Sequence, residues 1–271
     1  MSQPYITLYD TPSSQSNGWA PSIWRIRYDW ISRILTLANT DYKLLLRLIL
    51  NYKRLPYKTS WVEFPELDRT MRSIGAPVTS TRSDGRSVYT LPVIVDPLRS
   101  PSAPVVLSNP SIISEYLEIN YPARPLFPDG SKALQTLFVH YLHEVFSKPL
   151  LPIMIPLSAQ KLPERSQAHF FAHGQKLHEP YPSGPQREQA WIAIRDNFNF
   201  LASVLDKNSG DDGDSVLVSG KELTYADFAL CSIMIWIERL SPQEGWPRIK
   251  TWNGGRWSRL MERCRAFMDV M

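Results

Sequence analysis

The stretch LTYADFALCSIMIWIERL, residues 223–240, decides the architecture of the second half of the chain. Thr224 and Asp227 have the spacing of a capping box, in which two side chains satisfy free N–H groups at a helix N-terminus. The residues behind them are apolar on nearly every face, which is typical of a helix at the centre of a bundle. Because this apolar run is too short to cross a membrane, we expect a soluble protein with no membrane partner.

The helical pattern extends back from this stretch toward a proline-rich segment. Residues 186–206 carry apolar side chains at steps of three and four, which predicts one buried face of a long helix made by Trp191, Ile194, Phe198, Leu201 and Leu205. YPARPLFPDG, residues 121–130, contains three prolines and a glycine. This composition favours a linker at 122–130, followed by an all-helical domain over 131–271.

Residues 1–121 have a mixed pattern of short strands and helices. Strands are predicted at 6–9 and 58–64, with a helix between them that begins at Pro21, and a short helix at 67–74 stopped by Gly75. SDGRSVYTLPVIVDP, residues 83–97, then reads as a turn and two strands, and Pro110 occupies a first helical position. This order predicts a small α/β unit.

Composition excludes several functional classes. The chain has 30 basic and 26 acidic residues, a net charge of +4, and this scattered surplus is too small to indicate nucleic acid or acidic membranes. Cys231 and Cys264 form neither a disulfide framework nor a redox pair, and no secretory signal begins the sequence. We therefore expect a cytoplasmic protein. His140 and His143 lack an accompanying carboxylate motif, so we expect no metal site.

Taken together, these elements resemble a glutathione transferase, and more narrowly the fungal class A group related to bacterial lignin β-etherases. The resemblance runs over nearly the whole chain and is carried by WAPSIWRIRY with NYKRLPYKTSWVEF, by YTLPVI, by IISEYLEINYP with PLFP, and by LTYADF with WIERL and WNGGRW. It implies an α/β plus all-α fold: a thioredoxin-like, glutathione-binding N-terminal domain at 1–121, the linker, and an all-helical C-terminal domain.

The resemblance also implies where the co-substrate glutathione binds. In this family the residue before a cis-proline pairs with the cysteinyl backbone of glutathione, and here that pair is Leu91 and Pro92. The γ-glutamyl carboxylate binds at the next helix, where Ser108 and Asn109 can cap and the N–H of Ser111 is expected to point outward.

Two positions depart from the family pattern. Relatives have an acidic residue and a serine where this chain has Asn109 and Pro110, and proline offers neither a hydroxyl nor an N–H. Losing a charge-assisted hydrogen bond costs about 1.5–3 kcal/mol, so we expect weaker glutathione binding. Relatives also carry a serine after the first-helix tryptophan, whereas here Trp19 is followed by Ala20.

Three outcomes remain open for the thiolate site at the first helix. Ser22 could supply the catalytic hydroxyl, although each helical residue turns a side chain by about 100°. The helix N-terminus alone could lower the thiol pKa, or the site could bind little glutathione. The expected function is conjugation or glutathione-dependent cleavage of hydrophobic aromatic substrates, and the alternative is a catalytically impaired protein that binds phenolic small molecules. Family resemblance further implies a homodimer.

Aromatic side chains could form a cleft for the second substrate. The candidates are Trp19, Trp24, Phe146, Met154 and Phe170, with Ile155 and Phe171 beside them. Such a cleft would suit flat phenolic or lignin-derived molecules, but for any one of these residues a place in the core is the more common outcome.

One leucine-rich segment does not fit the pattern. Relatives run from the first helix almost directly into the NYK element, whereas here 29–49 intervenes, and residues 44–50 are apolar on too many faces for a surface helix. We interpret 29–49 as an atypical insertion, either a lineage-specific excursion or a translated intron, and expect a bulky apolar loop.

Overall fold

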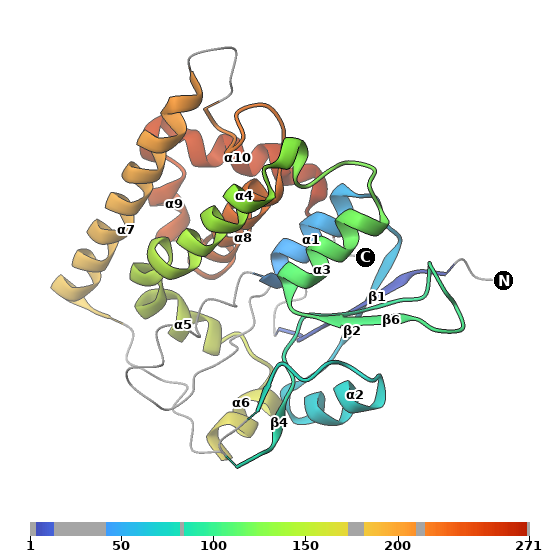
Figure 1. The fold of residues 1–271 in the computed structure, drawn as a ribbon. Helices are drawn as coiled ribbons and strands as arrows, with labels where there is room; N and C mark the ends of the chain where they lie inside the picture. The colour runs from blue at the N-terminus through green and yellow to red at the C-terminus, as the bar shows by residue number, and fades with distance from the viewer. Residues whose placement is uncertain (1–3, 14–41, 82–83, 173–181, 210–214, 270–271) are drawn as a thin grey trace.

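The computed structural model describes residues 4–13, 42–81, 84–172, 182–209 and 215–269. Figure 1 shows a small sheet and its helices on one side of the molecule and a bundle built from the second half of the chain on the other. This is the architecture expected from the sequence, a thioredoxin-like sheet domain followed by a helical domain.

The main sheet has four strands in the order β2-β1-β5-β6. Their bounds are β1 Ile6–Asp10, β2 Tyr57–Trp61, β5 Val93–Asp96 and β6 Val105–Ser108. β1 and β2 are parallel, and the other neighbours are antiparallel. A two-stranded ribbon, β3 Ser80–Thr81 with β4 Ser87–Val88, lies outside this sheet. The second strand ends earlier than predicted, because a 3₁₀ turn at Phe64–Glu66 follows it.

Three helices accompany the strands: α1 Tyr42–Tyr52, α2 Leu67–Ser73 and α3 Pro110–Asn120. α1 and α3 lie side by side against one face of the sheet, and α2 lies apart from them (Figure 1). Gly75, which follows α2, has a φ of +69°, a conformation that suits glycine and explains why the helix stops there.

α1 corrects the expectation of an apolar loop over 29–49. Residues 42–49 belong to this helix, whereas 29–41 lie outside the described residues. Residues 44–50 are all buried because α1 packs between the sheet and the central helix of the bundle. A helix covered on both sides must be apolar on most faces, which is why its pattern did not resemble a surface helix.

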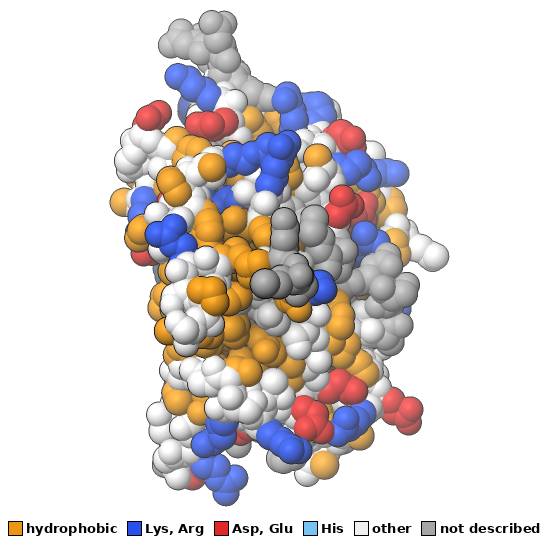
Figure 2. All heavy atoms as spheres, turned by 90° about the vertical axis from the view of Figure 1, so that its right-hand side faces the viewer, with side chains coloured by type: hydrophobic (Ala, Val, Ile, Leu, Met, Phe, Trp, Pro, Cys, Tyr) orange, Lys and Arg blue, Asp and Glu red, His pale blue; other side chains and the backbone are white. Residues whose placement is uncertain are grey.

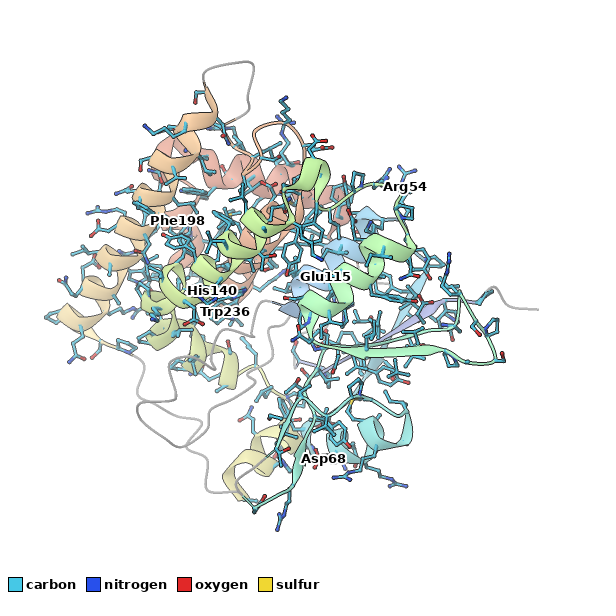
Figure 3. The ribbon with its side chains drawn as sticks, in the orientation of Figure 1. Arg54, Asp68, Glu115, His140, Phe198 and Trp236 are labelled. Atoms are coloured by element: carbon cyan, nitrogen blue, oxygen red, sulfur yellow. The ribbon has the colours of Figure 1, made fainter. Side chains whose placement is uncertain are left out.

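The second half of the chain is helical. The helices are α4 Lys132–Tyr141, α5 Leu151–Ala159, α6 Glu164–Ala172, α7 Gly184–Leu205, α8 Tyr225–Leu240, α9 Gly245–Ile249 and α10 Arg256–Cys264. α8 is the central helix, and its predicted capping box is present: the N–H of Thr224 donates to Asp227 at 2.9 Å. The predicted apolar face of α7 is buried as expected, and Figure 3 shows Phe198 pointing from it into the bundle.

A buried lysine joins α1 to α3 and to the segment that follows α3. The Nζ of Lys53 donates to Glu118 at 2.7 Å and to the carbonyl oxygen of Tyr121 at 2.8 Å. Glu118 in turn accepts from the N–H groups of Leu126 and Phe127. The end of α1, the helix α3 and the segment that leads to α4 therefore share one charged junction. None of the described helices is long and apolar enough to cross a membrane.

Candidate functional site

The strand register brings four segments together at one end of the sheet. Tyr9 of β1 and Ser108 of β6 both pair with Val93, the first residue of β5, while the last residues of β1 and β2 pair with each other. Thr11, Val62, Pro92 and Asn109 are the next residues beyond these pairs, so they lie at the same end. This arrangement puts the predicted glutathione-binding residues on neighbouring strands.

The bond between Leu91 and Pro92 is cis, as the sequence predicted. Both residues are buried, and they precede β5 directly. The main chain of Leu91 therefore lies at the end of a central strand, beside the segment that leads from β6 into α3.

The start of α3 differs from the expectation in one respect. Asn109 precedes the helix with φ 74° and ψ 114°, and its Oδ1 accepts a hydrogen bond from the N–H of Ser111 at 3.0 Å. This N–H was expected to point freely outward, but the asparagine cap already engages it. An incoming carboxylate must displace the cap or use the hydroxyl of Ser111. Ser108 is buried at the end of β6 and contributes no exposed cap.

Tyr225 reaches this helix start from the bundle. Its ring is buried at the first position of α8 and packs on Phe127, with 4.9 Å between ring centroids. Burial raises the pKa of Tyr225, and the nearby hydroxyls of Ser111 and Ser114 oppose that rise. Within the described part of the chain, neither serine hydroxyl lies in a geometry that makes a regular hydrogen bond with the phenol oxygen. Sequence reasoning missed this contact because LTYADF was interpreted only as a helix cap.

A buried ion pair supports the end of β1. Arg47 donates to Asp10 at 2.8 Å and to the hydroxyl of Thr59 at 2.8 Å, and its guanidinium lies 5.0 Å from the ring centroid of Trp61. The exposed fractions of the Arg47 and Asp10 side chains are 0% and 1%. Asp10 also accepts from the N–H of Thr11 at 2.7 Å, so the pair holds the main chain at the site end of the sheet. Sequence reasoning missed Arg47 because it belongs to the segment interpreted as an insertion.

Helix α6 approaches the same end of the sheet from the second half of the chain. The hydroxyl of Ser166 donates to Glu63 at 3.0 Å, and Arg165 forms an ion pair with Glu66. Figure 1 shows α6 beside β4 and away from the other helices of the bundle. The residues after β2 and this helix therefore form one wall beside the site.

Of the residues predicted to bind the second substrate, some lie outside the described part of the chain and two are buried in the core. Trp19, Ala20, Ser22 and Trp24 lie outside the described residues, and so do the side chains of Phe170 and Phe171. Phe146 and Met154 are fully buried in the core, and Phe146 packs edge-on against Phe198. For these two residues the core interpretation of the sequence fits the structure, since protein atoms surround both side chains. Ile155 is half-buried.

The two histidines of the α4 region form no metal site with other residues that the structure describes. His143 is buried in a π-helical turn, Leu142–Phe146, whereas His140 is exposed near the end of α4. Burial lowers the pKa of His143 to about 4, and the charge of His140 adds to this effect. Within the described parts of the chain, no group of three His, Cys, Asp or Glu side chains could hold a metal ion.

Comparisons with known proteins agree with this architecture. Residues 133–267 match the family model for the C-terminal domain of glutathione S-transferases. The chain is 26% identical over 225 residues, 79% of each chain, to the glutathione S-transferase-like protein ustS of Aspergillus flavus.

Among the crystal structures that resemble nearly the whole chain are two glutathione transferases. Glutathione transferase GSTFuA3 from Phanerochaete chrysosporium is 30% identical, with full coverage of both chains and a TM-score of 0.80. A glutathione S-transferase of Ceriporiopsis subvermispora, in complex with glutathione, is also 30% identical, with 98% of this chain and 99% of that chain covered and a TM-score of 0.79.

Proposed function

We propose, because the chain belongs to the glutathione transferase family, that it binds glutathione and uses the thiol to attack hydrophobic aromatic molecules. In a conjugation, the thiolate forms a carbon–sulfur bond and the leaving group departs with the electron pair. In an ether cleavage, the leaving group is a phenolate that then takes up a proton. We further propose that the chain belongs to the etherase-related fungal class A group and acts in the cytoplasm.

The main support for this proposal is that the main chain of Leu91 and the N-terminus of α3 lie at the same end of the sheet. Val93 and Ser108 pair across β5 and β6, so the end of one strand and the start of an 11-residue helix face the same space. A helix N-terminus offers N–H groups and the positive end of a dipole, which favour a carboxylate. In this proposal the γ-glutamyl carboxylate binds at Ser111, and Leu91 pairs with the cysteinyl backbone.

The cap on α3 would affect the affinity for glutathione, and the alanine at position 20 would affect the stabilisation of its thiolate. A carboxylate at the helix start competes with the Oδ1 of Asn109 for the N–H of Ser111. For the thiolate, Ser22 and the dipole of the first helix stay the two candidate sources of stabilisation. The complex of the Ceriporiopsis subvermispora relative with glutathione supports a glutathione-using protein over a ligand-binding protein that has lost catalysis.

We also propose that the protein forms a homodimer through α3 and α4. Large aliphatic side chains are exposed on both helices: Ile112 and Ile119 on α3, and Leu134 and Leu137 on α4, with exposed fractions of 53% to 75%. An ion pair between Lys132 and Glu115, 2.8 Å apart, joins the two helices. Figure 2 shows hydrophobic side chains gathered across the middle of one face, between charged groups above and below. Such clusters commonly mark protein interfaces.

Calorimetric titration with glutathione, followed by a conjugation assay with a chlorodinitrobenzene, tests the enzymatic proposal. We expect saturable binding and a measurable rate. Ala20→Ser should raise the rate by about tenfold to hundredfold, the value of one charge-assisted hydrogen bond to the thiolate. Ser22→Ala is the matched variant, and a loss of rate there would assign the hydroxyl to Ser22. An absence of glutathione binding to the unmodified protein would refute the proposal.

A further inference from the structure

A second cavity lies at the opposite end of the sheet from the proposed glutathione site. It is open to solvent on one side and has a volume of about 300 Å³ between the end of α1, the segment that follows α3, and the last described residues of the chain. Leu55, in its wall, comes just before β2 begins, whereas the glutathione site lies beyond the end of β2. Ligand binding here would therefore be independent of the proposed function.

Two arginines in the wall adopt a left-handed backbone conformation, which is unfavourable for residues other than glycine. Arg54 has a φ of 53° and Arg124 a φ of 58°. The N–H of Arg54 donates to the carbonyl oxygen of Asn51, and the N–H of Leu55 donates to the carbonyl oxygen of Leu50. Arg54 therefore occupies the left-handed position that ends α1. Glycine is the usual residue there. Strained positions that keep a large side chain concentrate at functional sites, which points to a role for these guanidinium groups.

The charge and hydrogen-bonding groups of the cavity suit an anion. Arg124 is fixed in the wall, because it donates to the carbonyl oxygen of Tyr52 at 2.9 Å and lies over the ring of Tyr52. The exposed guanidinium of Arg54 has no hydrogen bond, ion pair or ring contact with any described residue. Figure 3 shows Arg54 near the end of α1, on the outer side of the molecule. Two arginines thus face one acidic lining residue, Asp269.

An amide and an apolar wall complete the cavity. The Nδ2 of Asn51 donates to the carbonyl oxygens of Phe267 and Asp269 at 2.7 and 2.6 Å, which fastens the end of the chain to α1. Its Oδ1 is buried and accepts no hydrogen bond from a described residue, so the role of Asn51 here is to hold the end of the chain in the wall. Leu55 and Phe267 supply the apolar surface.

We propose that this cavity binds a small aromatic carboxylate. The carboxylate would pair with Arg54 and Arg124, because guanidinium groups match carboxylate geometry with two parallel hydrogen bonds. The ring would pack against Leu55 and Phe267. A volume near 300 Å³ lies at the lower end of small-molecule sites, so the ligand has one or two rings.

Calorimetric titration of the full chain with 2-naphthoate, in the presence of saturating glutathione, tests this site. We expect one equivalent to bind, and Arg54→Gly to weaken binding by about tenfold to hundredfold, as for the loss of a hydrogen bond to a charged group. Because glycine favours the left-handed conformation, Arg54→Gly should melt at the same or a higher temperature than the unmodified protein. Thus weaker binding would not reflect unfolding.

Two further variants and a neutral ligand keep the test decisive. Arg86→Gly removes the same charge from an exposed turn far from the cavity and should leave binding unchanged. Arg54→Asn tolerates the left-handed conformation, removes the charge and replaces Arg54→Gly if that variant fails to fold. 2-Naphthamide should bind much more weakly than 2-naphthoate. No saturable binding to the unmodified protein would overturn the proposal, and so would Arg54 variants that bind 2-naphthoate as tightly as the unmodified protein does.

Discussion

Replacing Arg47 with methionine tests both the buried ion pair and the place of α1 in the core. The variant leaves Asp10 without its cationic partner at a position where the side chain is only 1% exposed. Breaking a buried pair in this way costs about 3–5 kcal/mol, because the remaining charge stays desolvated. The hydrogen bond from Arg47 to Thr59 is lost as well, whereas the one from Thr11 to Asp10 remains and moderates the cost. We therefore expect the free energy of unfolding to fall by about 3–5 kcal/mol.

Urea denaturation at pH 7 measures this loss, and a double-mutant cycle isolates the pair. Asp10→Asn should also destabilise, since it removes the negative charge that compensates the buried guanidinium of Arg47, but the double variant should lose much less than the sum of the single variants. A coupling energy of about 2 kcal/mol or more is expected for such a contact. Arg86→Met is the matched control, because Arg86 and Asp84 form an exposed pair 3.5 Å apart that should contribute less than about 1 kcal/mol.

The result that would refute this reasoning is a loss below about 1 kcal/mol for Arg47→Met, similar to the exposed control. Such a value would mean that residues 42–49 do not pack between the sheet and α8. It would support the earlier interpretation of this segment as an external insertion. A loss in the expected range together with additive single variants would instead place Arg47 in the core but reject its coupling to Asp10.

Three further predictions follow from the same contacts. The pKa of His143 is lowered to about 4 in the folded protein, so between pH 6.5 and about 4 the unfolded chain binds a proton that the folded chain does not. The free energy of unfolding should therefore fall by about 3 kcal/mol on acidification through that range. Urea denaturation should show a weaker pH dependence for His143→Phe, and an unchanged pH dependence would contradict the prediction. Pro110→Ser should strengthen glutathione binding by about tenfold or more in calorimetry, because it restores a hydroxyl and an N–H at the start of α3, and equal affinity would place the carboxylate elsewhere. Ile119→Glu should shift the protein from dimer to monomer in analytical ultracentrifugation, whereas Val78→Glu, an exposed aliphatic position outside α3 and α4, should not; a dimer that persists in Ile119→Glu would reject the proposed interface.

Local pattern was enough to predict the elements whose signals lie within a few residues. The capping box of Thr224 and Asp227, the apolar face of α7 and the start of α3 at Pro110 all depend on neighbours along the chain, and all three are present. The cis bond at Pro92 came from family resemblance, since most bonds before proline are trans.

Tertiary structure decided which buried groups meet. Arg47 pairs with Asp10 across 37 positions of sequence, and Tyr225 approaches Ser111 from another helix, so no local pattern could indicate either contact. Residues 44–50 show the limit most clearly: an apolar run has the same sequence pattern whether it forms a loop or a helix covered on two sides. Periodicity indicates which face of an element avoids water. Only the packing of distant elements determines what covers that face, and therefore which charges and hydroxyls become neighbours.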